Sequence, residues 1–211
     1  YTPPREVDHI GHATLAAGHL ILSRLNPERD QVRFLTENNY MLVQRNGLGV
    51  ALDMAALPPK PAALNEAIVS ALGARPTAAF AAKHHLFIFD HADEIIALKP
   101  DMAAIAQLEL PAVIVTAPGS GDVDFVSRFF APANGVPEDS VSGVSHCCLS
   151  PYWAQRLGRN RLIGRQLSKR GGIVECELRR QRVILGGKAT ICLEGRLHIG
   201  PPVQFENVVC Q

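Results

Sequence analysis

This chain of 211 residues has no large excess of positive or negative charge. It also has no long apolar run and no cysteines spaced as in common metal sites. Its formal net charge is +1 at pH 7, which argues against a protein built mainly to coat nucleic acid or an anionic membrane. No uninterrupted apolar stretch approaches the roughly 20 residues that span a bilayer. None of the five cysteines forms a Cys-x-x-Cys pair, so we expect no structural metal site. Their odd number fits reduced thiols in a cytoplasmic protein.

Hydrophobic patterning predicts strands arranged around two longer helices, at 11–25 and about 143–157. The first helix is apolar nearly all round, which is typical of a helix buried at the centre of a domain. Shorter helices are expected at 63–72 and 101–108. Strands are expected at 31–36, 40–45, 49–54, 86–89, 112–116, 123–130, 173–178, 182–185, 189–194 and 196–199.

A proline-rich segment at residues 57–61 is the best candidate for a domain boundary, because such a sequence is stiff. On each side of it, strands surround one helix whose start carries glycine and histidine. We therefore expect two domains of similar build.

The two predicted helix starts carry residues suited to binding a small anion. Unpaired backbone N–H groups give a helix N-terminus about half a positive charge, and glycine lets a ligand approach that backbone closely. The first start offers Gly11, His12 and Thr14, and the second offers carboxylates, hydroxyls and an imidazole within residues 138–146. We expect the two starts to face each other across a cleft that holds a small carboxylate. Serine, threonine and aspartate also cap helices, so a purely structural role for these residues stays open.

Two other patterns are interpreted as surface features. His84-His85 and residues 90–93 lack the spacing of a known metal motif. The six basic residues between Arg156 and Arg170 are expected on the exposed face of a helix and the loop after it.

Three blocks of the sequence carry a family resemblance. They are YTPPREVDHIGHATLAAGH at 1–19, RFFAPANGVPEDSVSGVSHCCLSPYW at 128–153, and LSKRGG at 167–172 followed by VILGGKA at 183–189. The first two resemble the "TP…E…GHATLAA" and "RFFAP…GV.EDPVTGSAHC.L.PYW" signatures of the PhzF-like family, the phenazine-biosynthesis-type isomerases. The third matches the closing segment of that family.

The resemblance implies a mixed α/β (α+β) fold like that of diaminopimelate epimerase. That fold has two pseudo-symmetric barrels, each a curled sheet around a central helix, with the site between them. We expect a first barrel domain of residues 1–60 plus about 192–211, and a second of residues 61–191. Members of the family usually form homodimers and shift a proton within their substrate without a cofactor or metal.

Carried over residue by residue, the resemblance implies two catalytic residues, His12 and Asp139. It implies a substrate-binding set of Gly11, Ala13, Gly143, Val144 and Ser145. The family has a serine directly after its second glycine, where this chain has Val144. Ser145 stands one place later, which is about 100° further round a helix.

The catalytic glutamate of the family lies upstream of the "TP" motif. Since this chain begins at Tyr1, we expect that glutamate to be absent from it. In such an enzyme the glutamate is the general acid and base, while His12 and Asp139 position the substrate and help to stabilise charge.

The leading hypothesis is therefore a PhzF-like isomerase, free of any cofactor, that shifts a proton on a small cyclic or unsaturated carboxylate. The alternative is a non-catalytic member of the same fold that binds a small molecule or a protein. Partners are expected to be the carboxylate and a second copy of the chain, with no nucleic acid or membrane.

Overall fold

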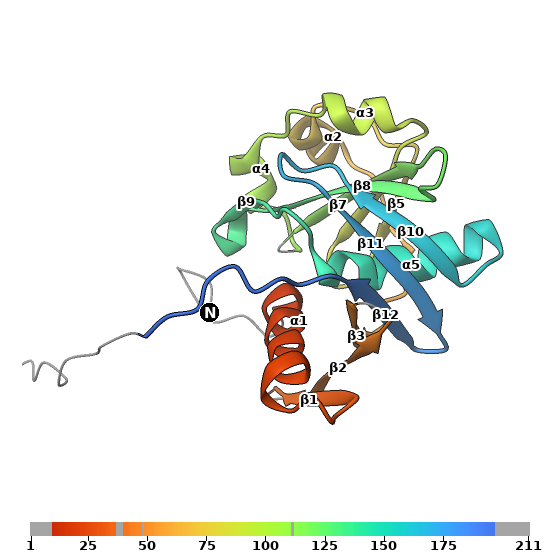
Figure 1. Cartoon of the computed structure of the whole chain (residues 1–211). Coiled ribbons are helices and arrows are strands. Elements are labelled where there is room, and N and C mark those ends of the chain that lie inside the picture. Colours follow the sequence, from red (N-terminus) through yellow and green to blue (C-terminus); the bar gives the residue numbers. More distant parts are fainter. Residues whose placement is uncertain (1–9, 37–39, 48, 111, 197–211) are drawn as a thin grey trace, which may run out of the picture.

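The computed structural model describes residues 10–36, 40–47, 49–110 and 112–196, and a twelve-stranded sheet runs through them (Figure 1). Its strand order is β1-β2-β3-β12-β11-β10-β8-β7-β6-β5-β4, with β9 paired to β8 off this path. The pairs β6–β7 and β8–β10 are parallel, and the other pairs are antiparallel. The strands are β1 (Gln31–Leu35), β2 (Tyr40–Asn46), β3 (Gly49–Ala55), β4 (Lys60–Pro61), β5 (Ala78–Ala81), β6 (His85–Ile88), β7 (Val113–Pro118), β8 (Phe125–Ala131), β9 (Val136–Glu138), β10 (Arg161–Gln166), β11 (Gly172–Arg179) and β12 (Arg182–Gly187).

Helices lie on both faces of this sheet (Figure 1). Helix α1 packs against β2 and β3, whereas α5 packs against β10, β11 and β12. Three short helices, α2, α3 and α4, form a separate core on the other face of the β5–β8 strands. The bounds are α1 (Gly11–Leu20), α2 (Glu66–Leu72), α3 (Ala92–Ala97), α4 (Met102–Ala106) and α5 (Gly143–Leu157), with a π-helical turn at Ile21–Leu25 and a 3-10 turn at Pro132–Asn134.

Two hydrophobic cores result from the alternation of side chains along each strand. On β6, Leu86 and Ile88 pack into the core that contains α5. Phe87 lies between them in sequence and points to the opposite face, into the core under α2, α3 and α4. A strand buried on both faces reads as a continuous apolar run, which is why this segment of the sequence is so hydrophobic.

The pairing of β12 with β3 joins the strands around α1 to those around α5. Its register runs from Arg182 opposite Ala55 to Gly187 opposite Val50. An ion pair between Arg182 Nε and Asp53 Oδ1, at 2.7 Å, reinforces the ladder. This ladder makes the sheet continuous across the described residues, so the sheet itself marks no domain boundary. The division into residues 1–60 plus about 192–211 and residues 61–191 stays a prediction.

A proline inside α5 creates a second tie between the two parts. Pro151 has no N–H to donate to the carbonyl oxygen of Cys147, four residues earlier. That oxygen accepts instead from the backbone N–H of Leu57, at 2.9 Å. The chain leaving β3 is thereby fixed to the side of α5.

The predicted second helix is confirmed at both ends. Ser142 is its N-cap, accepting from Ser145 N at 3.2 Å, and Gly158 follows it in the left-handed conformation with φ of 67°. The strands expected at 31–36, 40–45, 49–54, 173–178 and 182–185 are also confirmed to within two residues at either end.

The first helix differs from expectation in two ways. Its α-helical part ends at Leu20 and a π-helical turn follows. The prediction that it is buried was wrong, because only Gly18 in α1 and Leu22 in the π-helical turn are buried, while His12, Ala13 and Ala16 are exposed. Within the described residues, strands cover only one side of α1. On that side Gly18 lies so close to Val43 that an added Cβ would be 2.5 Å from Val43 Cγ1.

Two other predictions need correction. The strand expected at 189–194 is irregular chain, and the one expected at 196–199 lies largely outside the described residues. The basic stretch expected as a loop contains β10. In it Arg161 and Arg165 face outwards, while Leu162 and Gln166 are buried. The strand was hidden because its outward positions combine two arginines with Ile163 and its inward positions combine Leu162 with Gly164 and Gln166, so apolar and polar residues do not alternate. The sequence analysis also missed β5 and α3.

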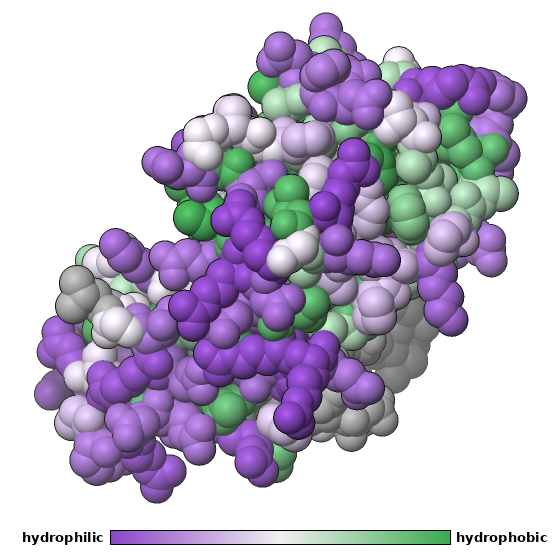
Figure 2. Space-filling model, turned by 90° about the vertical axis from the view of Figure 1, so that its right-hand side faces the viewer, coloured by the Kyte–Doolittle hydropathy of each residue, from purple (hydrophilic) through white to green (hydrophobic). Residues whose placement is uncertain are grey.

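Hydrophilic side chains cover most of the face seen in Figure 2, where apolar residues are interspersed among them. No helix of the described residues is long and apolar enough to cross a membrane.

Two histidines are buried in the core on the α5 side. His84 is 5% exposed, and neither of its ring nitrogens has a hydrogen-bond partner among the described residues. His146 is fully buried, and its Nδ1–H donates to Ser142 O at 2.7 Å. Burial lowers the pKa of each imidazole to about 4, with the charge of Lys83 adding to the effect at His84.

Because of these two histidines, we expect the folded protein to become less stable in acid. The unfolded chain takes up both protons near pH 6.5 and the folded chain near pH 4, so stability present above pH 6.5 is lost as the pH falls towards 4. Each residue should contribute up to roughly 3 kcal/mol to this loss. Urea unfolding at several pH values measures it. His84→Phe, which keeps an aromatic contact with Phe129, should remove about half of the pH dependence. An unchanged dependence in that variant would contradict the assignment.

Candidate functional site

The starts of α1 and α5 meet glycine to glycine. A Cβ placed on Gly11 would lie 3.7 Å from the Cα of Gly143, and one placed on Gly143 would lie 3.8 Å from the Cα of Gly11. The prediction that the two helix starts face each other is confirmed. At Gly143 every neighbour of the added atom is at 3.7 Å or more, which is ordinary van der Waals contact. Packing therefore does not demand glycine at this position, whereas access of a ligand to the backbone would.

The positive ends of two helix dipoles lie side by side at this contact. Neither helix has an acidic residue in its first turn, and no side chain of the described residues caps α1. At α5 the Ser142 hydroxyl accepts from Ser145 N, which leaves the N–H groups of Gly143 and Val144 without that cap. Two half charges of the same sign at such close range repel by roughly 1 kcal/mol at an effective dielectric constant of 20. An anion between the starts would turn this repulsion into attraction.

Gln166, at the end of β10, holds the loop that leads into α5. Its Oε1 accepts from Ser142 N at 3.0 Å, and its Nε2 donates to Asp139 O at 2.7 Å. Ser168 Oγ donates to Ser140 O at 2.6 Å. The side chain of Gln166 is fully buried, so these contacts fix the backbone of residues 139–142 from one side.

Arg128 fixes the other end of the same loop. Its Nε and Nη2 donate to the two carboxylate oxygens of Glu138 at 2.8 and 3.1 Å. Its Nη1 donates to the carbonyl oxygens of Ile95 and Leu98, both at 3.0 Å. This bidentate pair is largely buried, so Glu138 serves the structure and is engaged away from the helix starts.

The two predicted catalytic residues lie near the helix starts. His12 is exposed in the first turn of α1, next to the exposed Ala13. Asp139 is half-buried, and its backbone N–H donates to Phe129 O at 3.0 Å. Its carboxylate has no hydrogen bond to another described residue, so it is not the cap of α5. The catalytic roles of His12 and Asp139 remain predictions.

The predicted binding residues do not all face the same space. Gly11 and Gly143 lie together, and Val144 lines a cavity beside them. Ser145 is turned away into the core, where its Oγ donates to Ser142 O at 2.8 Å. Its hydroxyl therefore does not replace the one that the family has at the position of Val144.

The cavity beside the helix starts has a volume of about 180 Å³. It lies between α5, the ends of β2 and β3, and the turn before β6. Met54 connects it to the helix starts, because its Sδ would be 3.9 Å from a Cβ on Gly11 and 3.7 Å from one on Gly143. Its lining includes Tyr40, Met41, Met54, Leu57, Lys83, Val144 and Cys147.

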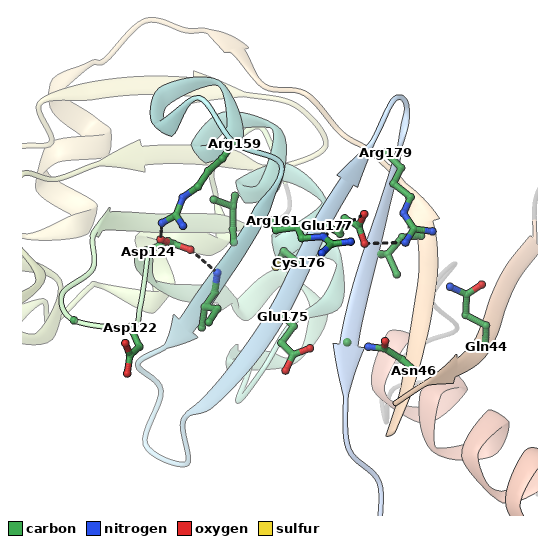
Figure 3. Close-up of a pocket in the computed structure, with 15 residues that line it drawn as sticks. Gln44, Asn46, Asp122, Asp124, Arg159, Arg161, Glu175, Cys176, Glu177 and Arg179 are labelled. Atoms are coloured by element: carbon green, nitrogen blue, oxygen red, sulfur yellow. Dashed lines mark hydrogen bonds and ion pairs between the residues drawn. The ribbon is translucent and has the colours of Figure 1, made fainter. Parts of the chain in front are cut away.

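A larger hollow, of about 770 Å³, lies on the outer face of β10, β11 and β12, away from α5 (Figure 3). Its charged walls are largely paired with each other. Arg159 binds Asp124, and Glu177 binds Arg179 at 2.8 Å and Arg161 at 3.6 Å. Exposed pairs of this kind are screened by solvent, and this hollow contains none of the predicted site residues.

Sequence reasoning missed Gln166 and Met54. The signal for Gln166 was present in Arg-Gln-Leu-Ser, where a strand alternation would have turned the amide inwards. No local sequence pattern indicated that Met54 lies at the site, because its position depends on how β3 packs against α1 and α5. Among the described residues no group of three histidine, cysteine, aspartate or glutamate side chains is placed to hold a metal ion.

Comparison with known proteins gives consistent matches. The family model described as "Phenazine biosynthesis-like protein" (PhzC-PhzF) matches residues 1–195. An uncharacterized isomerase of Pseudomonas aeruginosa is 40% identical over 199 residues, which cover 94% of this chain and 76% of that protein. An uncharacterized isomerase of Halalkalibacterium halodurans is 35% identical over 203 residues, covering 93% of this chain and 76% of that protein.

Solved structures of the same family have a similar fold. A phenazine biosynthesis protein of the PhzF family from Enterococcus faecalis has a TM-score of 0.88 at 33% identity, covering 94% of this chain and 76% of that chain. A protein from Pseudomonas aeruginosa described as a predicted epimerase has a TM-score of 0.61 at 14% identity, covering 89% of this chain and 74% of that one. The second likeness shows the fold alone. The predicted mixed α/β (α+β), epimerase-like fold class is confirmed.

Replacing Gln166 should loosen the loop before α5. Gln166→Leu leaves the buried Ser142 N–H and Asp139 carbonyl without partners, which should lower the free energy of unfolding by about 2–4 kcal/mol. Urea unfolding measures this loss. Gln107→Leu, at an exposed position after α4, is the matched control and should change it by less than about 0.5 kcal/mol. Equal effects of the two variants would show that Gln166 does not hold the loop.

Proposed function

The chain belongs to the phenazine biosynthesis-like (PhzC-PhzF) family and is an isomerase of that general type, and we propose that it shifts a proton within a small cyclic or unsaturated carboxylate. The observation that carries this proposal is the contact between two helix starts of the same polarity, with no acidic residue in either first turn. A carboxylate bound beside both glycines would accept backbone hydrogen bonds from both helices.

The same geometry suits the chemistry. Removing a proton from a carbon conjugated with a carboxylate spreads negative charge onto the carboxylate oxygens. Backbone N–H groups that already point at those oxygens stabilise this charge without reorganising, which is where such donors contribute most to a rate. The proton then returns to a different carbon of the same conjugated system, so the product is an isomer and no redox partner is needed.

Among the described residues, His12 and Asp139 are titratable groups next to the two helix starts that are not buried. Since the family's glutamate is expected to be absent from this chain, the imidazole of His12 would take the proton from one carbon and return it to the other, and the carboxylate of Asp139 would hold the substrate or the imidazole in position. The exposure of His12 and the absence of a hydrogen bond from the Asp139 carboxylate to the described residues both leave these groups available to a ligand.

A second candidate function is binding without turnover. Two observations favour it: Val144 stands where the family has a serine, and the hydroxyl of Ser145 is engaged in the core. On this alternative the helix starts would hold the carboxylate, and its carbon-bound protons would not exchange with solvent.

Substituting Gly143 by alanine tests the carboxylate site. Ala is up to about 1 kcal/mol more favourable than Gly in a helix, and the new methyl group has room, so stability should be unchanged or higher. Binding of benzoate, measured by calorimetry, should weaken at least about tenfold because the methyl shields N–H groups whose charge-assisted bonds are worth about 1.5–3 kcal/mol each. Gly195→Ala, in open irregular chain, is the control. Unchanged benzoate affinity in Gly143→Ala would contradict the proposal.

Deuterium exchange separates the enzyme from the binder. With 1-cyclohexenecarboxylate in heavy water, we expect deuterium to enter the ring next to the double bond, as followed by NMR. His12→Asn and Asp139→Asn should abolish the incorporation, while the melting temperature stays within a few degrees because neither side chain is buried. Binding without incorporation by the unaltered chain would establish the alternative function.

A further inference from the structure

Most of the wall of the cavity beside the helix starts is apolar. Val144 and Cys147 stand one turn apart on α5, so they share one face of the helix. Met41, Met54 and Leu57 close the cavity from β2, β3 and the chain after β3. These five side chains are aliphatic, thioether or thiol groups, which are at best weak hydrogen-bonding partners.

The thiol does not introduce a charge. Burial raises the pKa of the Cys147 thiol above its ordinary value, so the group stays protonated near neutral pH. Its Sγ lies 3.8 Å from the Met54 Sδ, in a sulfur–sulfur contact within the wall. Tyr40 and Lys83 also border the cavity, and each is engaged with other groups of the protein.

The size of the cavity limits what it can hold. At about 180 Å³ it is slightly larger than a cavity of roughly 150 Å³ that is known to accept benzene. It is smaller than the roughly 300–1,000 Å³ of sites for drug-sized ligands. One six-membered ring with a small substituent, or a short branched chain, would fill it.

From these observations we propose that the cavity is an apolar subsite that selects the carboxylate by the group attached to it. The inference rests on the proposed function, since the carboxylate itself would lie between Gly11 and Gly143. Met54 borders both the helix starts and the cavity, so the two lie side by side. A ring bearing a methyl or hydrogen at the cavity is accepted, and one bearing a hydroxyl there is disfavoured. Val144 is the specificity-determining residue, because it brings an apolar side chain to the first turn of α5.

The direct test compares two carboxylates of nearly equal size and equal charge, 3-methylbenzoate and 3-hydroxybenzoate. Calorimetry on the unaltered chain should show the methyl compound binding about 10- to 100-fold more tightly, the range by which apolar pockets discriminate against an added hydroxyl. Equal binding of the two compounds would overturn the inference.

Val144→Thr keeps the volume of the side chain and adds a hydroxyl to the wall. It should reduce the preference for the methyl compound at least fivefold, mainly by improving binding of 3-hydroxybenzoate. Val144→Ser should act in the same direction if the threonine hydroxyl instead bonds to its own helix backbone. Val123→Thr, at another half-buried valine that packs against the core under α2, α3 and α4 and does not line the cavity, should leave the preference unchanged. An unchanged preference in both Val144 variants would overturn the inference.

Failure of this inference can be distinguished from failure of the proposed function. If Gly143→Ala weakens both compounds while the unaltered chain binds them equally, the helix starts bind carboxylates and the subsite assignment alone is wrong. If Gly143→Ala changes neither affinity, the carboxylate is held elsewhere and the proposed function is wrong. If neither compound binds the unaltered chain, both are contradicted.

Discussion

Electrostatic repulsion between the starts of α1 and α5 is the constraint that the rest of the fold has to overcome. Both starts are positively polarised, they touch at Gly11 and Gly143, and neither has an acidic residue in its first turn. The β3–β12 ladder, the ion pair of Arg182 with Asp53, and the bond from Leu57 to the carbonyl of Cys147 hold the two helices at this distance. An anion bound at the two starts would offset this repulsion, which is why we propose a carboxylate ligand there.

In the loop before α5, most of the polar side chains serve to hold the backbone of the site in place. Arg128 and Glu138 lock one end of that loop, and Gln166 and Ser168 lock the other. These polar contacts are largely buried, so they orient the backbone more rigidly than exposed pairs would. The groups left available to a ligand are few: backbone N–H groups at two glycines, the imidazole of His12 and the carboxylate of Asp139.

Local signals in the sequence predicted α5 and several of the strands around it, among them β3, β11 and β12. Ser142 and Gly158 cap the two ends of α5, and because they are adjacent to the helix in sequence, its bounds can be predicted from that segment alone. The burial of α1 could not be predicted in this way, because it depends on which strands cover the helix. The role of Gln166 depends on contacts to residues 24 and 27 positions away, and Met54 depends on the docking of β3. Tertiary contacts of this kind leave no periodic trace.

The most direct test of the site is a crystal structure of the chain with 3-bromobenzoate, in which the anomalous signal of bromine locates the ring. We expect the bromine in the cavity beside Val144 and Met54, with the carboxylate accepting hydrogen bonds from the first-turn N–H groups of both α1 and α5. A bromine peak confined to the outer hollow of β10–β12, with no anion between Gly11 and Gly143, would contradict the proposal that the two helix starts form the site.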